Sequence, residues 1–267
     1  MNTKNRLLMY NPNLAQSWML FFTTILCILA AGGVIRIIIH VAGITTNEWV
    51  SLSSSALGFA AVALIVIRLG GGNDEAPVAT TRLSPFIWLL LVPFIWSVSL
   101  AVTPLTMWIP MPDIIKQLFS FQNNLPTFLS MVVLAPVCEE WLCRGVILKG
   151  LLAHYPPRKA IIWSAVIFGV LHLNPWQGIS AFFGGLAIGW IYWRTRSLGY
   201  CIFMHAAKNA MGFILIFFFP NISFDSTSIE PATGFHIYAA ALFVCAITLA
   251  GINKIISSGT TSDIRIR

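Results

Sequence analysis

The chain has 267 residues, of which 57% are hydrophobic and 9% are charged, and its net charge is +7. Soluble domains carry about 25% charged residues, so this composition excludes an ordinary soluble domain and predicts a polytopic membrane protein. We expect no nucleic-acid partner, because the basic residues fall in short segments between apolar stretches, where membrane topology accounts for them.

Eight apolar segments approach the roughly 20 residues that a helix needs to cross a bilayer. Turn-forming sequences such as Pro156-Pro157 and Asn174-Pro175 separate several of them. The sequence therefore predicts an all-α fold, a polytopic transmembrane helical bundle of about eight spanning helices. The expected spans are approximately 18–41, 49–69, 84–104, 125–150, 159–174, 176–195, 198–219 and 233–256.

The distribution of Lys and Arg predicts the orientation of this bundle. With a cytoplasmic N-terminus, only Lys116 falls in an outer loop, while Arg36, Arg144 and Lys208 fall within helices. Because cytoplasmic loops are enriched in Lys and Arg, we expect both termini to be cytoplasmic. The other basic residues would all lie on the inner side: Lys4, Arg6, Arg68, Arg82, Lys149, Arg158, Lys159, Arg194, Arg196, Lys254, Arg265 and Arg267.

Three regions are expected along the chain. Residues 1–124 form a three-helix membrane region that ends in an interfacial segment at about 111–122, and 125–219 form a polar-containing helical core. Residues 220–267 hold the last spanning helix and a polar cytoplasmic tail. The first apolar segment exceeds the apolar core of a signal peptide, so we expect an uncleaved helix there.

Two adjacent carboxylates, Glu139 and Glu140, lie inside the apolar segment 125–150 and are followed by Arg144. Ionisable groups within a membrane cost several kcal/mol, so they are functional candidates. Residues four apart share a helix face, so Arg144 is expected to pair with Glu140. Glu139 points about 100° away at 3.6 residues per turn. It is therefore the less neutralised carboxylate and the better candidate for a general base. The alternative is that both acids only hold helices together.

Two further segments carry polar groups that can join this pair. His172 follows Phe168 at helical spacing, and its imidazole can position water or bind a metal. His205 and Asn209 are also four apart, and their N–H groups are suitable donors to an oxyanion. The alternative for that pair is an interhelical hydrogen bond. At 1.5 Å per residue, Glu139 and His205 lie about 10–15 Å from the inner face and His172 about 20 Å.

These motifs resemble those of a known family. The patterns Glu139-Glu140-x-x-x-Arg144, Phe168-x-x-x-His172 and His205-x-x-x-Asn209 occur in the order found in the CPBP intramembrane proteases. This family is also called Abi and includes the type II CAAX prenyl endopeptidases. The resemblance covers about residues 125–219.

The resemblance implies an intramembrane endopeptidase that cleaves a membrane-anchored peptide or protein. The residue matching Glu139 would activate water with help from the one matching His172, and those matching His205 and Asn209 would hold the oxyanion. Glu140 and Arg144 would be the supporting pair.

The family's metal dependence leaves the cofactor open between none and Zn²⁺. Glu139, His172 and His205 could supply a set of two His and one Glu as zinc ligands. We favour metal-free activation of water. If Glu139 bound a metal, Glu140 would be the one nearby acid left to act as base, and Glu140 is expected to be paired with Arg144.

Two other functions fit the same residues. One is a proton-coupled transporter that uses the buried acids as a relay, although the paired broken helices of many carriers are missing from the sequence. The other is a non-catalytic membrane protein for peptide immunity or scaffolding. For either function, or for a protease, membrane lipid is the expected environment, and we expect a bacterial plasma membrane.

Overall fold

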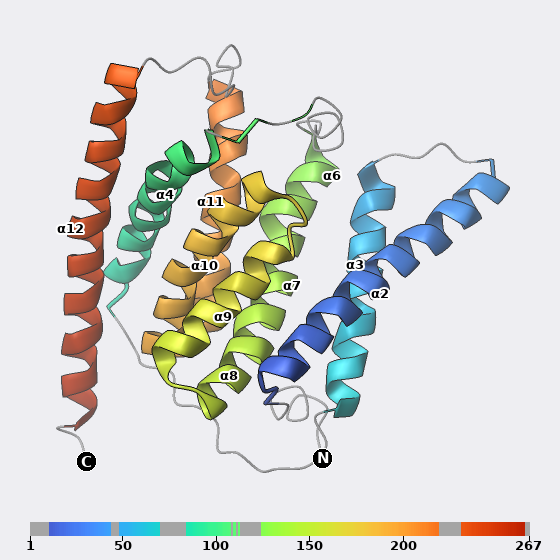
Figure 1. Ribbon diagram of the computed structural model, residues 1–267, viewed down its shortest axis with the longest axis horizontal. Coiled ribbons are helices and arrows are strands. Elements are labelled where there is room, and N and C mark those ends of the chain that lie inside the picture. Colours follow the sequence, from blue (N-terminus) through green and yellow to red (C-terminus); the bar gives the residue numbers. More distant parts are fainter. Residues whose placement is uncertain are drawn as a thin grey trace.

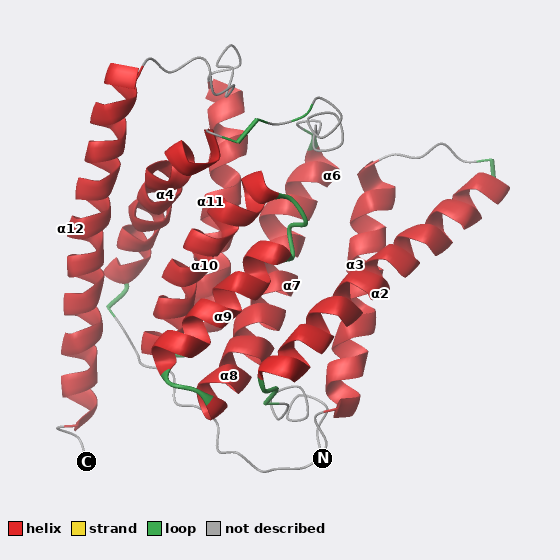
Figure 2. Cartoon of the chain, in the orientation of Figure 1, coloured by secondary structure: helices red, strands yellow, loops and turns green. Residues whose placement is uncertain are grey.

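The computed structural model describes residues 11–43, 48–69, 84–107, 109–110, 112, 124–218 and 231–264. All regular elements in these ranges are helices, as the sequence predicts (Figure 2). The helices alternate in direction and lie roughly along one axis (Figure 1). The interfacial segment expected at 111–122 lies outside the described residues, apart from Pro112.

The helices follow the expected segments closely, although a run of short helical pieces replaces the expected 125–150 helix. Their bounds are α2 Leu14–Val41, α3 Glu48–Leu69, α4 Phe86–Met107, α6 Leu125–Phe128, η1 Leu129–Leu134, α7 Ala135–Glu140, η2 Trp141–Leu148, α8 Lys149–His154, α9 Pro157–Val170, α10 Pro175–Thr195, α11 Leu198–Phe218 and α12 Pro231–Ile264.

Four described helices are long and apolar enough to cross a membrane: Leu14–Val41, Glu48–Leu69, Phe86–Thr106 and Phe235–Ser258. They indicate an integral membrane protein. The others expected to span carry the polar residues, and α9, with 14 residues, is only about 21 Å long against a hydrocarbon core of about 30 Å. The number of eight spans therefore stays a prediction.

The rod formed by residues 125–154 changes its winding twice. Both η1 and η2 are π-helical, with hydrogen bonds to the fifth residue along the chain, a form that is rare and often found at functional sites. The first widened turn directly precedes Pro136, which has no N–H to donate. The π-helical turn therefore accommodates Pro136 without ending the rod. The rod continues through Glu139 and Glu140.

The α2–α3 hairpin lies at one edge of the bundle (Figure 1). Close contact at the start of α2 fixes it there, because Pro12 lies directly against Gly150 of α8. His154 Nε2 also lies 3.1 Å from the Asn11 carbonyl oxygen. The far end of α2 is largely exposed, and α3 also contacts α6 and η1.

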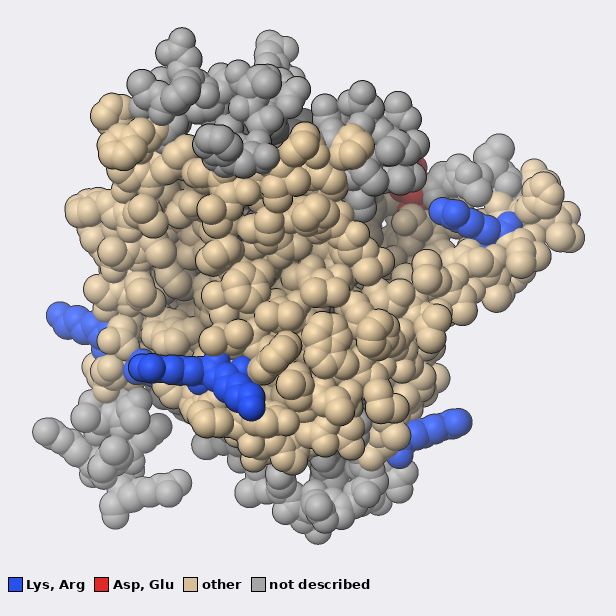
Figure 3. All heavy atoms as spheres, in the orientation of Figure 1, with Lys and Arg blue, Asp and Glu red and all other residues tan. Residues whose placement is uncertain are grey.

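Charged side chains avoid the middle of the face shown in Figure 3, which is a broad uncharged band. Most of the Lys and Arg atoms in that view lie toward the end of the bundle where α8 and the end of α12 are found (Figures 1 and 3). The described basic residues at the helix ends on that side include Arg68, Arg158, Lys159, Arg194 and Lys254. This arrangement is the one expected of a membrane-crossing bundle with its basic end in the cytoplasm.

The crossing of α2 and α3 generates a stability prediction. A Cβ at Gly58 would lie 2.7 Å from the Ile28 Cα atom, while one at Gly33 would meet nothing within 4 Å. We expect Gly58→Ala to lower the free energy of unfolding by about 1–3 kcal/mol, because the helices must separate. The matched control Gly33→Ala should be neutral or stabilising, since alanine favours helix. Thermal unfolding in detergent measures both, and equal stability of the two variants would contradict the observed crossing.

Candidate active site

The centre of the site is a buried ion cluster. The side chains of Glu140 and Arg144 are both fully buried, and Arg144 Nη1 donates to Glu140 Oε1 over 3.0 Å. His205 Nδ1 from α11 lies 2.9 Å from the same oxygen. Arg144 Nη2 also donates to the Gly185 carbonyl oxygen of α10 at 3.2 Å. One carboxylate thus connects the rod to α11, and its arginine partner connects it to α10.

The hydrogen bonds fix which ring nitrogen carries a proton in each imidazole. An ionised carboxylate and a backbone carbonyl can only accept hydrogen bonds. His205 Nδ1 therefore donates to Glu140, and His172 Nδ1 donates to the Phe168 carbonyl oxygen at 3.0 Å. Nε2 of each neutral imidazole is left as an acceptor, and Nε2 of His205 becomes a donor only in the imidazolium form.

Phe168 brings the two histidines and the arginine together. Its ring centroid lies 5.3 Å from that of His172 and 5.4 Å from that of His205, both in edge-to-face geometry. Arg144 Cζ lies 4.4 Å from the same ring centroid. A guanidinium over an aromatic face is attracted by the ring quadrupole. Phe168 is therefore a buried platform that fixes three polar groups from three different elements.

Asn209 is bound to the unusual backbone of η1. Its Nδ2 donates to the Met131 carbonyl oxygen at 2.7 Å. The N–H of Ala135 bonds to Ser130 in the π-helical pattern, and the residue five beyond Met131 is Pro136, which has no N–H. The Met131 carbonyl therefore lacks its backbone donor, and Asn209 supplies one. This leaves one of the two amide hydrogens of Asn209 for another partner.

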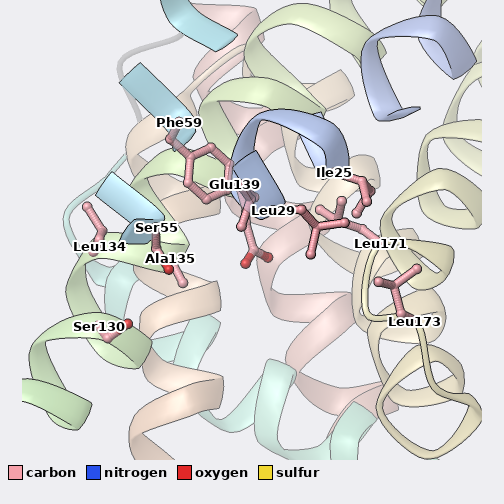
Figure 4. A pocket seen from close by; sticks show the side chains of 11 residues that line it. Ile25, Leu29, Ser55, Phe59, Ser130, Leu134, Ala135, Glu139, Leu171 and Leu173 are labelled. Atoms are coloured by element: carbon pink, nitrogen blue, oxygen red, sulfur yellow. The ribbon is translucent and has the colours of Figure 1, made fainter. Parts of the chain in front are cut away.

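Glu139 is the acid outside the ion cluster. Its Oε2 atom is buried and makes no hydrogen bond to any described residue. Its side chain lines a cavity of about 240 Å³ and points into it (Figure 4). The charge of Glu139 lies within electrostatic reach of His205, Arg144 and Lys208. A carboxylate in this setting is close to cations but remains available to a group that enters the cavity.

Lys208 of α11 donates from Nζ to the Ser180 carbonyl oxygen of α10 at 3.3 Å. It packs beside Gly184, where a Cβ would lie 3.4 Å from Nζ. Arg36, which the sequence also places within a helix, is exposed on α2.

The alternative to metal-free chemistry is a zinc ion held by Glu139, His172 and His205. Across the ranges that the structure covers, no three or more His, Cys, Asp or Glu side chains are grouped so that they could hold a metal ion. Glu139, His172 and His205 form no such group among these residues. His205 instead directs Nδ1 to Glu140, which is a hydrogen-bonding role.

The arrangement of the predicted residues differs in detail from the expected one. The ion pair of Glu140 with Arg144 is confirmed, and His172 and His205 lie on the two sides of Phe168. His205 hydrogen-bonds Glu140 and lies within electrostatic reach of Glu139. The sequence interpretation did not include Gly185 or the Met131 carbonyl in the site. The proline five residues after Met131 was the available signal for that carbonyl.

Two variants test whether Arg144 offsets the cost of burying the Glu140 charge. Arg144→Met should destabilise the protein by about 3–5 kcal/mol, because it leaves the Glu140 charge buried with too little compensation. Adding Glu140→Gln removes that charge, so the double variant should regain part of the lost stability. Unfolding in detergent measures both variants. A double variant less stable than Arg144→Met alone would contradict this account.

Comparison with known proteins bears on this segment of the chain. Residues 121–211 match the family model described as type II CAAX prenyl endopeptidase Rce1-like. No curated protein and no solved structure matches the chain. The matched residues include Glu139, Glu140, Arg144, His172 and the His205/Asn209 pair. Residues 121–211 are therefore similar to the Rce1-like type II CAAX prenyl endopeptidases, and the resemblance to the CPBP family that the motifs indicate is confirmed for this segment.

Proposed function

We propose that the protein is an intramembrane endopeptidase in which Glu139 is the general base. The observation that carries this proposal is the position of Glu139, a carboxylate outside the Glu140–Arg144 ion pair whose side chain points into a cavity. A purely structural acid would be expected to pair with the nearby arginine, as Glu140 does. The similarity of the surrounding segment to CAAX endopeptidases supports the same reaction class.

The reaction proceeds by attack of water on the scissile peptide carbonyl. Glu139 removes a proton from water as the new bond from oxygen to carbon forms, and the carbonyl oxygen becomes an oxyanion. The carbon–nitrogen bond then breaks, and the protonated Glu139 returns its proton to the leaving nitrogen. The products are a carboxylic acid and an amine, the acid's proton passes to the amine to give a carboxylate and an ammonium group, and Glu139 is again ionised.

The other polar groups stabilise and orient this reaction. Nε2 of His172 is an acceptor in the neutral ring and can hold the attacking water. Asn209 has an amide hydrogen left for the oxyanion, and His205 can donate from Nε2 as an imidazolium. Glu140 and Arg144 act through His205, since they fix its ring and balance its charge. No step requires a metal.

The substrate is proposed to be a membrane-anchored peptide or protein. The four apolar helices embed the enzyme in the bilayer, and the site lies among helices expected to cross it. A substrate anchored in the same membrane reaches such a site by lateral movement. The cytoplasmic placement of both termini and a bacterial plasma membrane location belong to this proposal as well.

The direct test is proteolysis by purified protein in detergent with a quenched peptide library. Glu139→Gln should reduce cleavage by about 100-fold to 10,000-fold, the usual range for loss of a general base. Unfolding measurements should show that the variant remains folded, because the Glu140 ion cluster is untouched. Adding a strong zinc chelator should leave wild-type cleavage unchanged.

Glu48→Gln is the matched control, because it makes the same chemical change at an acid in the first turn of α3. It should cleave at the wild-type rate. Full activity of Glu139→Gln would reject Glu139 as the base, and loss of activity on chelation would reject the metal-free mechanism. Uptake of solute without proteolysis would indicate the transporter instead.

A further inference from the structure

The cavity that receives Glu139 has two walls of different origin. One wall comes from the rod and the turn after α9, and its residues Ser130, Leu134, Ala135, Glu139, Leu171 and Leu173 all lie within the segment that matches the family model. The other wall comes from the α2–α3 hairpin, which lies outside that segment. It supplies Ile25, Ile28, Leu29, Ser55 and Phe59.

The lining of this cavity is mostly apolar. Among the described residues, its one titratable group is Glu139 and its hydroxyl groups are those of Ser55 and Ser130. Figure 4 shows the Phe59 ring and Leu29 on either side of the Glu139 carboxylate. A group that enters the cavity would therefore lie against aliphatic and aromatic surface while it is next to the proposed base.

The volume limits what this group can be. Sites for whole small molecules usually measure about 300–1,000 Å³, whereas this cavity measures about 240 Å³. Its size fits one large side chain better than an extended lipid chain. The apolar lining favours a leucine-like or phenylalanine-like side chain over a polar one, because burying an unpaired polar group costs free energy.

We propose that the α2–α3 hairpin forms the selecting wall of a subsite for one large apolar side chain of the substrate, next to the scissile bond. This inference rests on the proposed function, since it assumes that Glu139 attacks through water at that bond. Phe59 and Leu29 are then specificity-determining residues, and they limit the size of the side chain that the cavity accepts.

The hairpin is built to keep this wall in place. Gly58, directly before Phe59, allows α3 to approach the backbone of α2 at Ile28, where a Cβ would lie 2.7 Å from Cα. Phe59 is itself 8% exposed, so its ring is held within the packed core. The close crossing fixes Phe59 and Leu29 relative to each other, and the Pro12 contact with Gly150 fixes the base of α2 on the rod.

The test uses the full-length protein and peptides that differ only at the residues flanking the cleaved bond, with Ala, Leu, Phe or Trp at each position. Wild-type protein should prefer Leu or Phe over Ala at one flanking position. Phe59→Ala should shift the ratio of kcat/KM values toward Trp by about tenfold, the effect typical of a changed apolar pocket. Leu29→Ala, from the other helix of the hairpin, should shift it in the same direction.

Leu57→Ala is the control, because Leu57 is on the same helix, is 55% exposed and does not line the cavity. It should keep the wild-type preference. If Phe59→Ala unfolds, Leu29→Ala still decides the question, since Leu29 is 64% exposed and contributes little to the core. Cleavage with an unchanged preference in the folded cavity variants would overturn the subsite. Absence of cleavage by wild-type protein, or full cleavage by Glu139→Gln, would instead overturn the proposed function.

Discussion

The Glu140 carboxylate is the group around which the site is organised. A fully buried charge is tolerated only when it is paired and hydrogen-bonded. Glu140 Oε1 accepts from both Arg144 and His205, while Glu140 Oε2 has no hydrogen-bond partner among the described residues. Arg144 in turn binds the Gly185 carbonyl oxygen. Three elements that are distant in sequence must therefore meet at one point, and the position of each is set by the same charge balance.

The π-helical turn before Pro136 also determines how α11 is held against the rod. An α-helix interrupted by Pro136 would leave carbonyl groups without donors, and the π-helical turn before it changes which carbonyl is left. The Met131 oxygen is then satisfied by Asn209 from α11. A side chain that the motif marks as functional is thus also part of the packing. Its removal would affect stability as well as chemistry, so loss of activity at this position alone identifies no catalytic role.

Much of this arrangement could be read from the sequence, because apolar length and turn residues determine where the helices begin and end. The pairing of Glu140 with Arg144 also follows from local spacing. The partner of His205 does not, since it depends on how α11 rotates against the rod. The depth difference estimated for His172 is bridged by Phe168, whose ring contacts both imidazoles. The apolar wall from α2 and α3 carries no motif, so only the tertiary structure places it beside Glu139.

The two adjacent glutamates therefore divide their tasks by environment. Glu140 is neutralised by a guanidinium and fixes an imidazole, which makes it a poor proton acceptor for a substrate. Glu139, one residue away, faces a cavity, and each of the two acids keeps one buried oxygen without a partner among the described residues. Arg144 and Lys208 lie within electrostatic reach of Glu139, and neither hydrogen-bonds its Oε2 atom. Because Glu140 binds Arg144, the carboxylate of Glu139 is left to face the cavity.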